Sequence, residues 1–287
     1  MEKAGIDVEY FTVVGKGLKG YLKNVMPLTR HIRQKKYDVV HAHYSLSALT
    51  ATLAGCRPLV VSLMGSDIRL GFVFRQAVSF SSLFFWESLI VKSKDMQDNI
   101  RIKYSEIIPN GIDTDIFRPI EKKTARGRLG WNQDKRHILF AANPSRAAKN
   151  FQLAERAMAA GVFRKAELHV LGNVPHHDIP VYMNASDVVI LTSLWEGSPN
   201  VVKEAMACNC SVVATDVGDI RWLFGDEQGY FLTSFDPADV AYKMKMALDF
   251  AMQKGKTHGR ERMIELGLDS ESVARRIISV YERVVGK

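Results

Sequence analysis

The sequence of 287 residues has few cysteines and no long apolar stretch. Its three cysteines, Cys56, Cys208 and Cys210, are too few for a disulfide framework, which indicates a reducing compartment. No run of about 18 uncharged apolar residues occurs, so we expect no membrane-spanning helix. The first residues, Met1–Asp7, lack the apolar core of a secretory signal. Apolar residues make up 47% of the chain and charged residues 24%, which is typical of globular domains.

Charge is distributed unevenly along the chain. Up to Asn110 there are 15 Lys and Arg against 9 Asp and Glu, whereas the remainder has 24 against 22. A basic N-terminal part either faces anionic lipid or a phosphorylated substrate, or is simply a solvated surface. No nucleic-acid motif is present, and the basic residues are not interleaved with exposed aromatics, so we expect no nucleic-acid partner.

Short apolar runs alternate with amphipathic helical patterns in two blocks, which predicts parallel sheets covered on both faces. The first block opens with a predicted strand at Asp7–Val14 and a predicted helix at Tyr21–Gln34. A turn signal at Pro109–Gly111 and a polar stretch at Pro119–Lys123 separate the blocks. The pattern predicts two doubly wound α/β domains around a cleft, the usual ligand site of such sheets.

Aromatic residues concentrate in one segment of the first block, Phe72–Trp86, which contains six of them. Such a segment can form a helix that lies on a membrane surface. It is followed directly by an apolar run typical of a buried strand, at Ser88–Lys92, and this favours a buried helix instead.

The most informative stretch joins a predicted strand to a predicted helix in the second block. Ser198 suits the N-cap of that helix and Pro199 its first position. The amides of Asn200 and Val201 would then lie unpaired at the positive end of the helix dipole. Gly197 would let the backbone approach a ligand closely. The stretch is therefore either a phosphate site or an ordinary helix start.

Two carboxylates, Glu196 and Glu204, lie eight residues apart in the same stretch. If both were helical, a rise of about 1.5 Å per residue would separate them by roughly 12 Å, whereas the paired acids of glycosidases need about 5–9.5 Å. We interpret them as contacts to different parts of one extended ligand. Glu204, in the second helical turn, can accept two hydrogen bonds from a ribose diol, or it is a surface carboxylate.

The segment Glu196–Glu204 resembles the E-x7-E signature of family 4 retaining glycosyltransferases. Further stretches resemble motifs of that family in the family's order, at residues 37–43, 60–67, 108–113, and 204–209 followed by 215–218. The resemblance covers nearly the whole chain and is greatest to bacterial enzymes of surface-polysaccharide synthesis. It implies the GT-B fold, in which two Rossmann-like domains face a cleft. It also implies a cytoplasmic location, in part peripheral at the inner membrane face.

The resemblance assigns roles to residues of the second domain. It places Glu204 at the ribose hydroxyls of a nucleoside-diphosphate sugar and Glu196, as a catalytic residue, at the transferred sugar. The implied donor-binding set is Arg146, Lys149, Gly172, Gly197, Ser198, Asn200, Val201 and Glu204. A guanidinium and an ammonium can take up the charge of the leaving diphosphate without a metal. No Asp-x-Asp stands in a loop where Mg²⁺ would be expected, so we expect no metal and no cofactor. A glycan or lipid-linked acceptor is the implied second substrate.

The sequence departs from the family pattern at two places. Met64 stands where many relatives carry a histidine, and a methionine neither bonds a sugar hydroxyl strongly nor moves a proton. Asp67 is the candidate to take part of that catalytic role. Relatives also have a strand, a Gly-rich loop and a helix before the stretch that resembles Lys3–Glu9. An incomplete N-terminal domain is therefore expected, in which the strand Asp7–Val14 lacks its neighbour.

The implied division of the chain is an acceptor-side domain at residues 1–113, onto which the helix 270–287 packs back, and a donor-binding domain at residues 114–269. Two other functions stay open. Met64 favours a catalytically impaired remnant that only binds nucleotide sugars, and a GT-B sugar-nucleotide epimerase would share the donor motif.

Three smaller groups of residues have modest interpretations. His41 and His43 lie two apart on one strand and suit a metal in spacing, but without a third ligand we favour structural or acceptor-side roles. The run His176–Asp178 is predicted to be a surface loop. Cys208 and Cys210 are predicted to contribute to packing.

Overall fold

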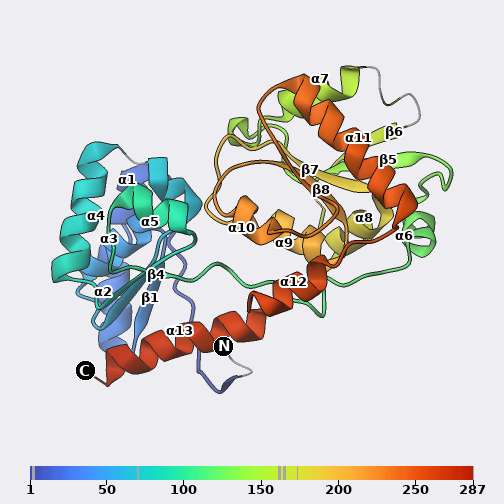
Figure 1. Cartoon of the computed structure of the whole chain (residues 1–287). Coiled ribbons are helices and arrows are strands. Elements are labelled where there is room, and N and C mark those ends of the chain that lie inside the picture. Colours follow the sequence, from blue (N-terminus) through green and yellow to red (C-terminus); the bar gives the residue numbers. More distant parts are fainter. Residues whose placement is uncertain (2–3, 70, 161–162, 164–165, 173, 287) are drawn as a thin grey trace. The chain divides into compact units, whose positions relative to one another are not determined.

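The computed structural model describes residues 1, 4–69, 71–160, 163, 166–172 and 174–286. The chain divides into two compact units (Figure 1). Unit 1 comprises residues 1–110 and 271–287, and unit 2 comprises residues 111–270. The C-terminal helix thus packs with the N-terminal part of the chain. The division lies a few residues from the boundaries expected from the sequence.

Unit 1 contains a parallel sheet in the order β1-β2-β3-β4, formed by Val40–His43, Leu59–Ser62, Ser88–Val91 and Glu106–Ile107. Successive residues of β2 point to opposite faces, and both faces are covered. Val61 packs into the cluster that includes Ala51 of α3, while Val60 packs with Val280 of α13. This double burial explains why the strand is apolar without alternation. The helices are α1 (Gly17–Leu22), α2 (Val25–Gln34), α3 (Ser45–Ala54), α4 (Phe72–Phe84), α5 (Lys94–Ile100) and α13 (Ser270–Val285).

Unit 2 contains a parallel sheet in the order β6-β5-β7-β8-β9, formed by Ala166–Val170, Arg136–Phe140, Val188–Leu191, Ser211–Thr215 and Tyr230–Thr233. The direction of winding reverses at β5, because β6 lies on one side of it and β7 on the other. Ligands of open α/β sheets bind at the carboxyl ends of the strands that flank such a switch point. The helices are α6 (Lys122–Leu129), α7 (Phe151–Ala159), α8 (Ile179–Ala185), α9 (Asn200–Ala207), α10 (Ile220–Phe224), α11 (Pro237–Gln253) and α12 (Gly259–Glu265).

The predicted strand at Asp7–Val14 is wrong. Residues 7–14, all of which the structure describes, are not part of either sheet. The alternation that suggested a strand instead lets Phe11 pack partly buried on the core of unit 1. Val14 is held by a side chain rather than by a strand, since its amide and its carbonyl both bond to the amide group of Asn24, at 3.3 and 2.9 Å.

The predicted helix at Tyr21–Gln34 is divided in the structure, because α1 ends at Leu22 and α2 begins at Val25. The cause is Pro27. A proline has no N–H to donate to the carbonyl four residues earlier, here that of Lys23, and its ring clashes with that carbonyl. Proline is tolerated in the first turn of a helix, which is where α2 places it.

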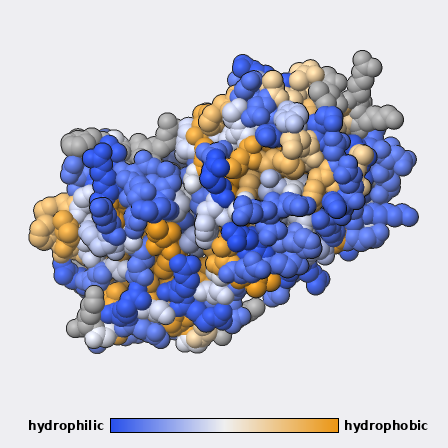
Figure 2. Space-filling view, in the orientation of Figure 1, coloured by the Kyte–Doolittle hydropathy of each residue, from blue (hydrophilic) through white to orange (hydrophobic). Residues whose placement is uncertain are grey.

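The prediction of a buried helix at Phe72–Trp86 is wrong for the second half of α4. Val78 and Ser82 are buried, but Phe80, Leu83 and Phe84 are 57–65% exposed. Figure 2 shows apolar surface at the left edge, where Figure 1 places α4. None of the described helices is long and apolar enough to cross a membrane.

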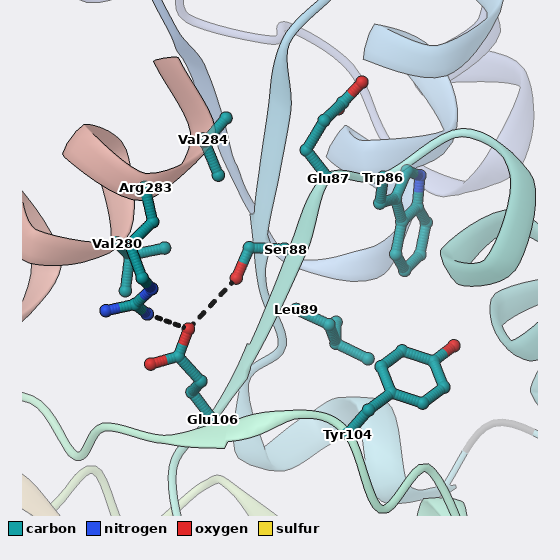
Figure 3. Close-up of a pocket in the computed structure, with 9 residues that line it drawn as sticks. All are labelled: Trp86, Glu87, Ser88, Leu89, Tyr104, Glu106, Val280, Arg283 and Val284. Atoms are coloured by element: carbon teal, nitrogen blue, oxygen red, sulfur yellow. Dashed lines mark hydrogen bonds and ion pairs between the residues drawn. The ribbon is translucent and has the colours of Figure 1, made fainter. Parts of the chain in front are cut away.

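Unit 1 has a small pocket of about 190 Å³ at the start of β3 and β4 (Figure 3). Glu106 lies inside it and joins Arg283 of α13, at 2.5 Å, to the hydroxyl of Ser88, at 3.4 Å. The amino ends of parallel strands lie at the edge opposite to the usual ligand site. The contacts of Glu106 therefore hold α13 against the sheet. The candidate active site lies elsewhere.

Candidate active site

Two loops meet at the switch point of unit 2, one after β5 and the other after β7. The amide of Leu194 donates to the carbonyl of Ala148 at 2.9 Å. The hydroxyl of Thr192 donates to the carbonyls of Lys149 and Asn150 at 3.0 and 2.9 Å. Each loop therefore satisfies backbone groups of the other, which fixes the side chains that they carry.

The two loops place Lys149 against Glu196. The ammonium of Lys149 lies 2.5 Å from Oε1 of Glu196, which also accepts a hydrogen bond from the hydroxyl of Ser193 at 2.7 Å. The side chains of Lys149 and Glu196 are 14% and 15% exposed, so solvent screens this ion pair only partly. The structure thus joins two residues that the sequence analysis assigned to the same ligand.

The helix α9 begins one residue later than predicted. Pro199 is its N-cap, with an extended backbone, and Asn200 is its first residue. Ser198 therefore lies before the cap, where its hydroxyl accepts a hydrogen bond from the ammonium of Lys203 at 3.1 Å. A proline offers no side-chain acceptor to the amides that follow it, so the positive end of α9 lacks a side-chain cap. The predicted anion site at the amides of Asn200 and Val201 keeps its physical basis.

Glu204 lies in the second turn of α9 and is largely buried, with a side chain 10% exposed. Burial raises the pKa of its carboxyl group, and the imidazole of His176 opposes the rise. The Nε2 atom of His176 lies 3.2 Å from Oε1 of Glu204. The surface loop predicted at His176–Asp178 is exposed but forms a short helical turn. Its contact with Glu204 was not predicted, because it joins residues 28 positions apart.

Lys203 and Asp219 were missed by the sequence analysis, although Lys203 is adjacent to Glu204. Lys203 is fully buried, and burial lowers its pKa to about 8, while Asp219 and Glu204 oppose the fall. Asp219 follows β8, and neither of its carboxylate oxygens has a hydrogen-bond partner among the described residues. Burial raises the pKa of Asp219 to about 6 against the influence of Ser198 and Lys203.

The buried carboxyl of Asp219 predicts a specific pH dependence of stability. A free aspartate titrates near 3.8, whereas the folded protein keeps this proton up to about pH 6, so the folded state binds more protons in that window. The contribution of Asp219 to stability is therefore complete below about pH 4 and is lost between pH 4 and 6, by up to about 3 kcal/mol. Denaturant unfolding of the parent and of Asp219→Asn at several pH values measures it. The difference in the free energy of unfolding between the parent and Asp219→Asn should change between pH 4 and 6, and a constant difference would contradict the prediction.

The remaining predicted donor residues of unit 2 lie at the same edge of the sheet. Arg146 is exposed in the loop after β5, and Gly172 follows β6. The carbonyl of Gly197 lies against Gly218 of the loop after β8, so close that a Cβ on Gly218 would stand 2.7 Å from it. The loops after β5, β6, β7 and β8 thus all contribute to the candidate site.

Asp67 belongs to unit 1 and is 3% exposed. Its carboxylate accepts hydrogen bonds from the hydroxyl of Ser45, from the amide of Ser45 at 3.2 Å and from the amide of Met64 at 2.5 Å. These bonds tie the start of α3 to the turn that contains Met64. The geometry supports a positioning role for Asp67, and its catalytic role stays a prediction.

His41 and His43 share one face of β1, and their rings stack with centroids 4.3 Å apart. His41 lies 2.6 Å from the hydroxyl of Tyr281 and 2.9 Å from that of Ser62. Burial lowers the pKa of His41 to about 3. A neutral histidine with both nitrogens engaged fits a structural role, one of the two roles that the sequence favours, and the acceptor-side role stays a prediction.

Family models match both units. Residues 3–116 match the model described as Glycosyltransferase Family 4, and residues 127–249 match that described as Glycosyl transferases group 1. A protein of Bacillus subtilis named as a teichuronic acid biosynthesis glycosyltransferase, TuaC, is 30% identical over 67% of this chain. This chain spans 56% of the length of that relative.

Two further proteins are similar along most of the chain. The Escherichia coli UDP-Gal:alpha-D-GlcNAc-diphosphoundecaprenol alpha-1,3-galactosyltransferase is 24% identical over 76% of this chain and 68% of its own. The structure of sucrose-phosphate synthase from Thermosynechococcus elongatus matches with a TM-score of 0.82 at 18% identity, over 94% of this chain and 79% of that one. The latter likeness shows the fold. The models, the relatives and the two parallel-sheet units together show that this chain belongs to the family 4 glycosyltransferases of the GT-B fold.

Proposed function

We propose that the protein transfers a sugar from a nucleoside-diphosphate sugar to a glycan or lipid-linked acceptor, with retention of anomeric configuration and without a metal ion. The observation that carries the donor part is the Lys149–Glu196 ion pair beside the uncapped start of α9. A fixed ammonium and free helix amides stabilise the charge that develops on a departing diphosphate.

The donor fits the site in one orientation. The diphosphate lies on the amides of Asn200 and Val201 and on the side chains of Arg146 and Lys149. Glu204, one helical turn further on, accepts hydrogen bonds from the ribose diol, and this orders the nucleoside behind the diphosphate. Glu196 then lies at the transferred sugar, where its carboxylate can accept a hydrogen bond from a sugar hydroxyl. The buried position of Glu204 makes such charge-assisted bonds stronger than they would be in water.

The acceptor proposal is supported by the names of two relatives, which describe teichuronic acid synthesis and a diphosphoundecaprenol acceptor. We place the reaction in the cytoplasm and in the synthesis of bacterial surface polysaccharide. A lipid-linked acceptor would bring the protein to the inner face of the membrane.

A screen of UDP-, GDP- and ADP-sugars in the presence of EDTA tests the proposal. We expect one nucleotide family to raise the melting temperature and to bind in calorimetry with EDTA present. Incubation with donor and candidate acceptors should then release the nucleoside diphosphate. Formation of an isomerised sugar nucleotide without acceptor and without net release of nucleoside diphosphate would favour the epimerase, and binding without any turnover would favour the non-catalytic remnant.

The substitution Glu204→Gln tests the ribose contact. It keeps the shape of the side chain but weakens charge-assisted hydrogen bonds worth about 1.5–3 kcal/mol, so nucleotide affinity should fall roughly ten- to hundredfold. The control is Glu155→Gln, an exposed carboxylate on α7 of the same unit. Calorimetry measures both, and an unchanged dissociation constant in Glu204→Gln would remove this residue from the site.

Peripheral membrane contact is proposed from the exposed residues Phe80, Leu83, Phe84 and Phe85 in and after α4. The residues up to Asn110 carry an excess of basic side chains, which anionic lipid attracts. Replacing Leu83 and Phe84 by serine should reduce co-sedimentation with anionic vesicles severalfold, since the buried apolar area is lost. The matched control replaces Tyr242 and Met252, exposed on α11 of unit 2, and equal binding of both variants would contradict the proposal.

A further inference from the structure

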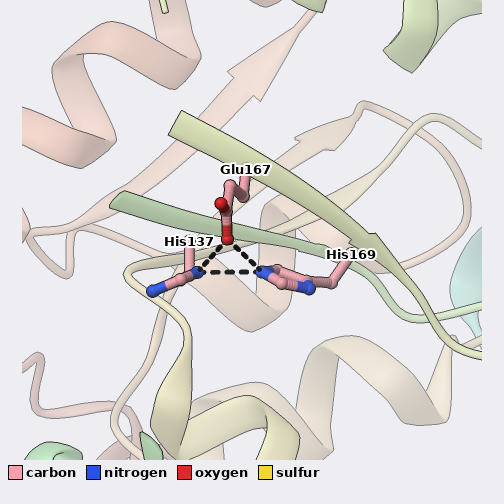
Figure 4. Close-up of side chains that lie close together, drawn as sticks. All are labelled: His137, Glu167 and His169. Carbon is pink, nitrogen blue, oxygen red and sulfur yellow. Dashed lines mark hydrogen bonds and ion pairs between the residues drawn. The ribbon is translucent and has the colours of Figure 1, made fainter. Parts of the chain in front are cut away.

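Two histidines and a glutamate converge on one face of the sheet in unit 2, on residues that the proposed transfer does not use (Figure 4). Glu167 and His169 lie two residues apart on β6 and therefore point to the same face. His137 on β5 is the register partner of Glu167, so it points to that face as well. The convergence follows from the strand pairing, not from flexible loops.

The ligating atoms lie close to one another. Nδ1 of His137 is 2.8 Å from Nε2 of His169, and Oε2 of Glu167 is 3.7 and 3.8 Å from these two nitrogens. Ligands of a tetrahedral zinc ion, at about 2.0–2.1 Å from the metal, are separated by about 3.3 Å. The carboxylate needs to approach by a few tenths of an ångström. In the metal-free protein one imidazole donates a hydrogen bond to the other. The two rings would separate slightly when an ion takes the place of that hydrogen.

The surroundings of His137 prepare it as a ligand. Its Nε2 lies 2.8 Å from the backbone carbonyl of Asn132, which can only accept, so Nε2 carries the hydrogen. The lone pair is then on Nδ1, the atom that faces the cluster. Histidine ligands of metals are held in this way, with the second ring nitrogen donating to a carbonyl.

Packing holds the second imidazole, and one side of the cluster stays open. The ring of Trp131 stacks on that of His169 with centroids 3.6 Å apart. His137 is fully buried, whereas the side chains of His169 and Glu167 are 22% and 39% exposed, which leaves room for an ion to enter and for a water ligand. Lys135 binds Oε1 of Glu167 at 2.5 Å and leaves Oε2 for the ion.

We propose that His137, Glu167 and His169 bind a late first-row divalent ion, with Zn²⁺ as the best match, and that the ion cross-links β6 to β5. Two imidazoles and a carboxylate, with an open fourth position, form a donor set that favours zinc over Mg²⁺ or Ca²⁺. Because β6 is at the edge of the described sheet, the ion would stabilise the folded state rather than take part in transfer.

Zinc titration of the full chain, freed of metal by a chelator and carrying no affinity tag, tests the proposal. In calorimetry we expect about one Zn²⁺ per chain and a melting temperature that rises with zinc. Loss of an outer partner of a ligand alone costs about 10–100-fold in metal affinity, so His169→Ala and Glu167→Gln should each bind at least about 100-fold more weakly. Co²⁺ in place of Zn²⁺ should give the absorption spectrum of a four-coordinate ion, and both variants should lose it.

The matched control is His177→Ala, which removes an exposed histidine that lies 3.5 Å from Asp178. This variant should bind zinc as the parent does. Absence of binding by the parent, or undiminished affinity in both His169→Ala and Glu167→Gln, would overturn the proposal. The half-exposed Glu167 makes Glu167→Gln informative even if His169→Ala folds poorly. Nucleotide binding in EDTA is measured separately, so failure of the zinc site leaves the proposed transferase function standing.

Discussion

Replacing Lys149 by methionine is expected to lower turnover of the donor by about 10²–10³-fold, the usual cost of removing one group that stabilises developing charge. The ammonium lies 2.5 Å from Glu196 and is largely shielded, so a donor diphosphate meets a cation that is already in place. Methionine keeps the length of the side chain and removes its charge. The affinity for a nucleoside diphosphate should therefore fall, whereas that for the bare nucleoside should not.

The control for this substitution is Lys245→Met. Lys245 is exposed on α11 and forms an ion pair with Asp249 at 2.7 Å, so the same change of side chain is made at a pair of little energetic value. Steady-state kinetics and calorimetry with the nucleoside and its diphosphate measure both variants. If Lys149→Met weakens nucleoside and diphosphate equally, Lys149 acts by ordering its loop and not by contacting phosphate. A double-mutant cycle with Glu196→Gln would then measure how strongly the pair is coupled.

The strands β5, β7 and β8 of unit 2 were predictable because each is a short apolar run buried on both faces. The apolar run Ser211–Thr215 predicts a strand with the bounds of β8, and the run His137–Ala141 predicts one that begins and ends one residue later than β5. Helices with an apolar stripe were predictable for the same reason, as Ser270–Val285 illustrates. Hydrophobic periodicity indicates which residues are buried, and burial is what stabilises these elements.

The helix α6 was not predictable in this way. The polar stretch Pro119–Lys123 overlaps only its first two residues, and the sequence predicts no element at residues 124–129, because this segment has hardly any apolar face. The helix is held by tertiary polar contacts, since Arg126 is buried and binds Asp187 at 2.8 Å and the carbonyl of Ala185 at 2.9 Å. Contacts between residues some 60 positions apart leave no local signal in a sequence.

The sequence predicts which residues belong to the candidate site better than it predicts the contacts between them. The family resemblance indicated Glu196, Glu204 and Lys149. It did not predict that His176 would contact Glu204 or that Lys203 would lie buried beside them. Those contacts depend on how four loops fold over one edge of the sheet, which spacing along the chain does not specify.

The substitution Gly218→Ala should destabilise unit 2 and weaken nucleotide binding together. Gly218 has a φ of +64°, a conformation that costs an L-residue about 1–2 kcal/mol. The added Cβ would also stand 2.7 Å from the carbonyl oxygen of Gly197 and 2.9 Å from that of Glu196. Overcrowding of packed backbone costs about 1–3 kcal/mol more, so we expect a total loss of about 2–5 kcal/mol.

The matched control is Gly130→Ala, since Gly130 has a φ of +66° but nothing within 4 Å of its added Cβ. This variant has the unfavourable backbone conformation without the collision. Its free energy of unfolding should fall by about 1–2 kcal/mol, and it should bind nucleotide as the parent does. Denaturant unfolding gives the two stabilities and calorimetry gives the two affinities. Because the collision pushes on the turn that holds Glu196 and leads into α9, Gly218→Ala should lose affinity under conditions where it is still folded. If the two variants lose stability and nucleotide affinity equally, the loop after β8 moves aside at no energetic cost and does not shape the donor site.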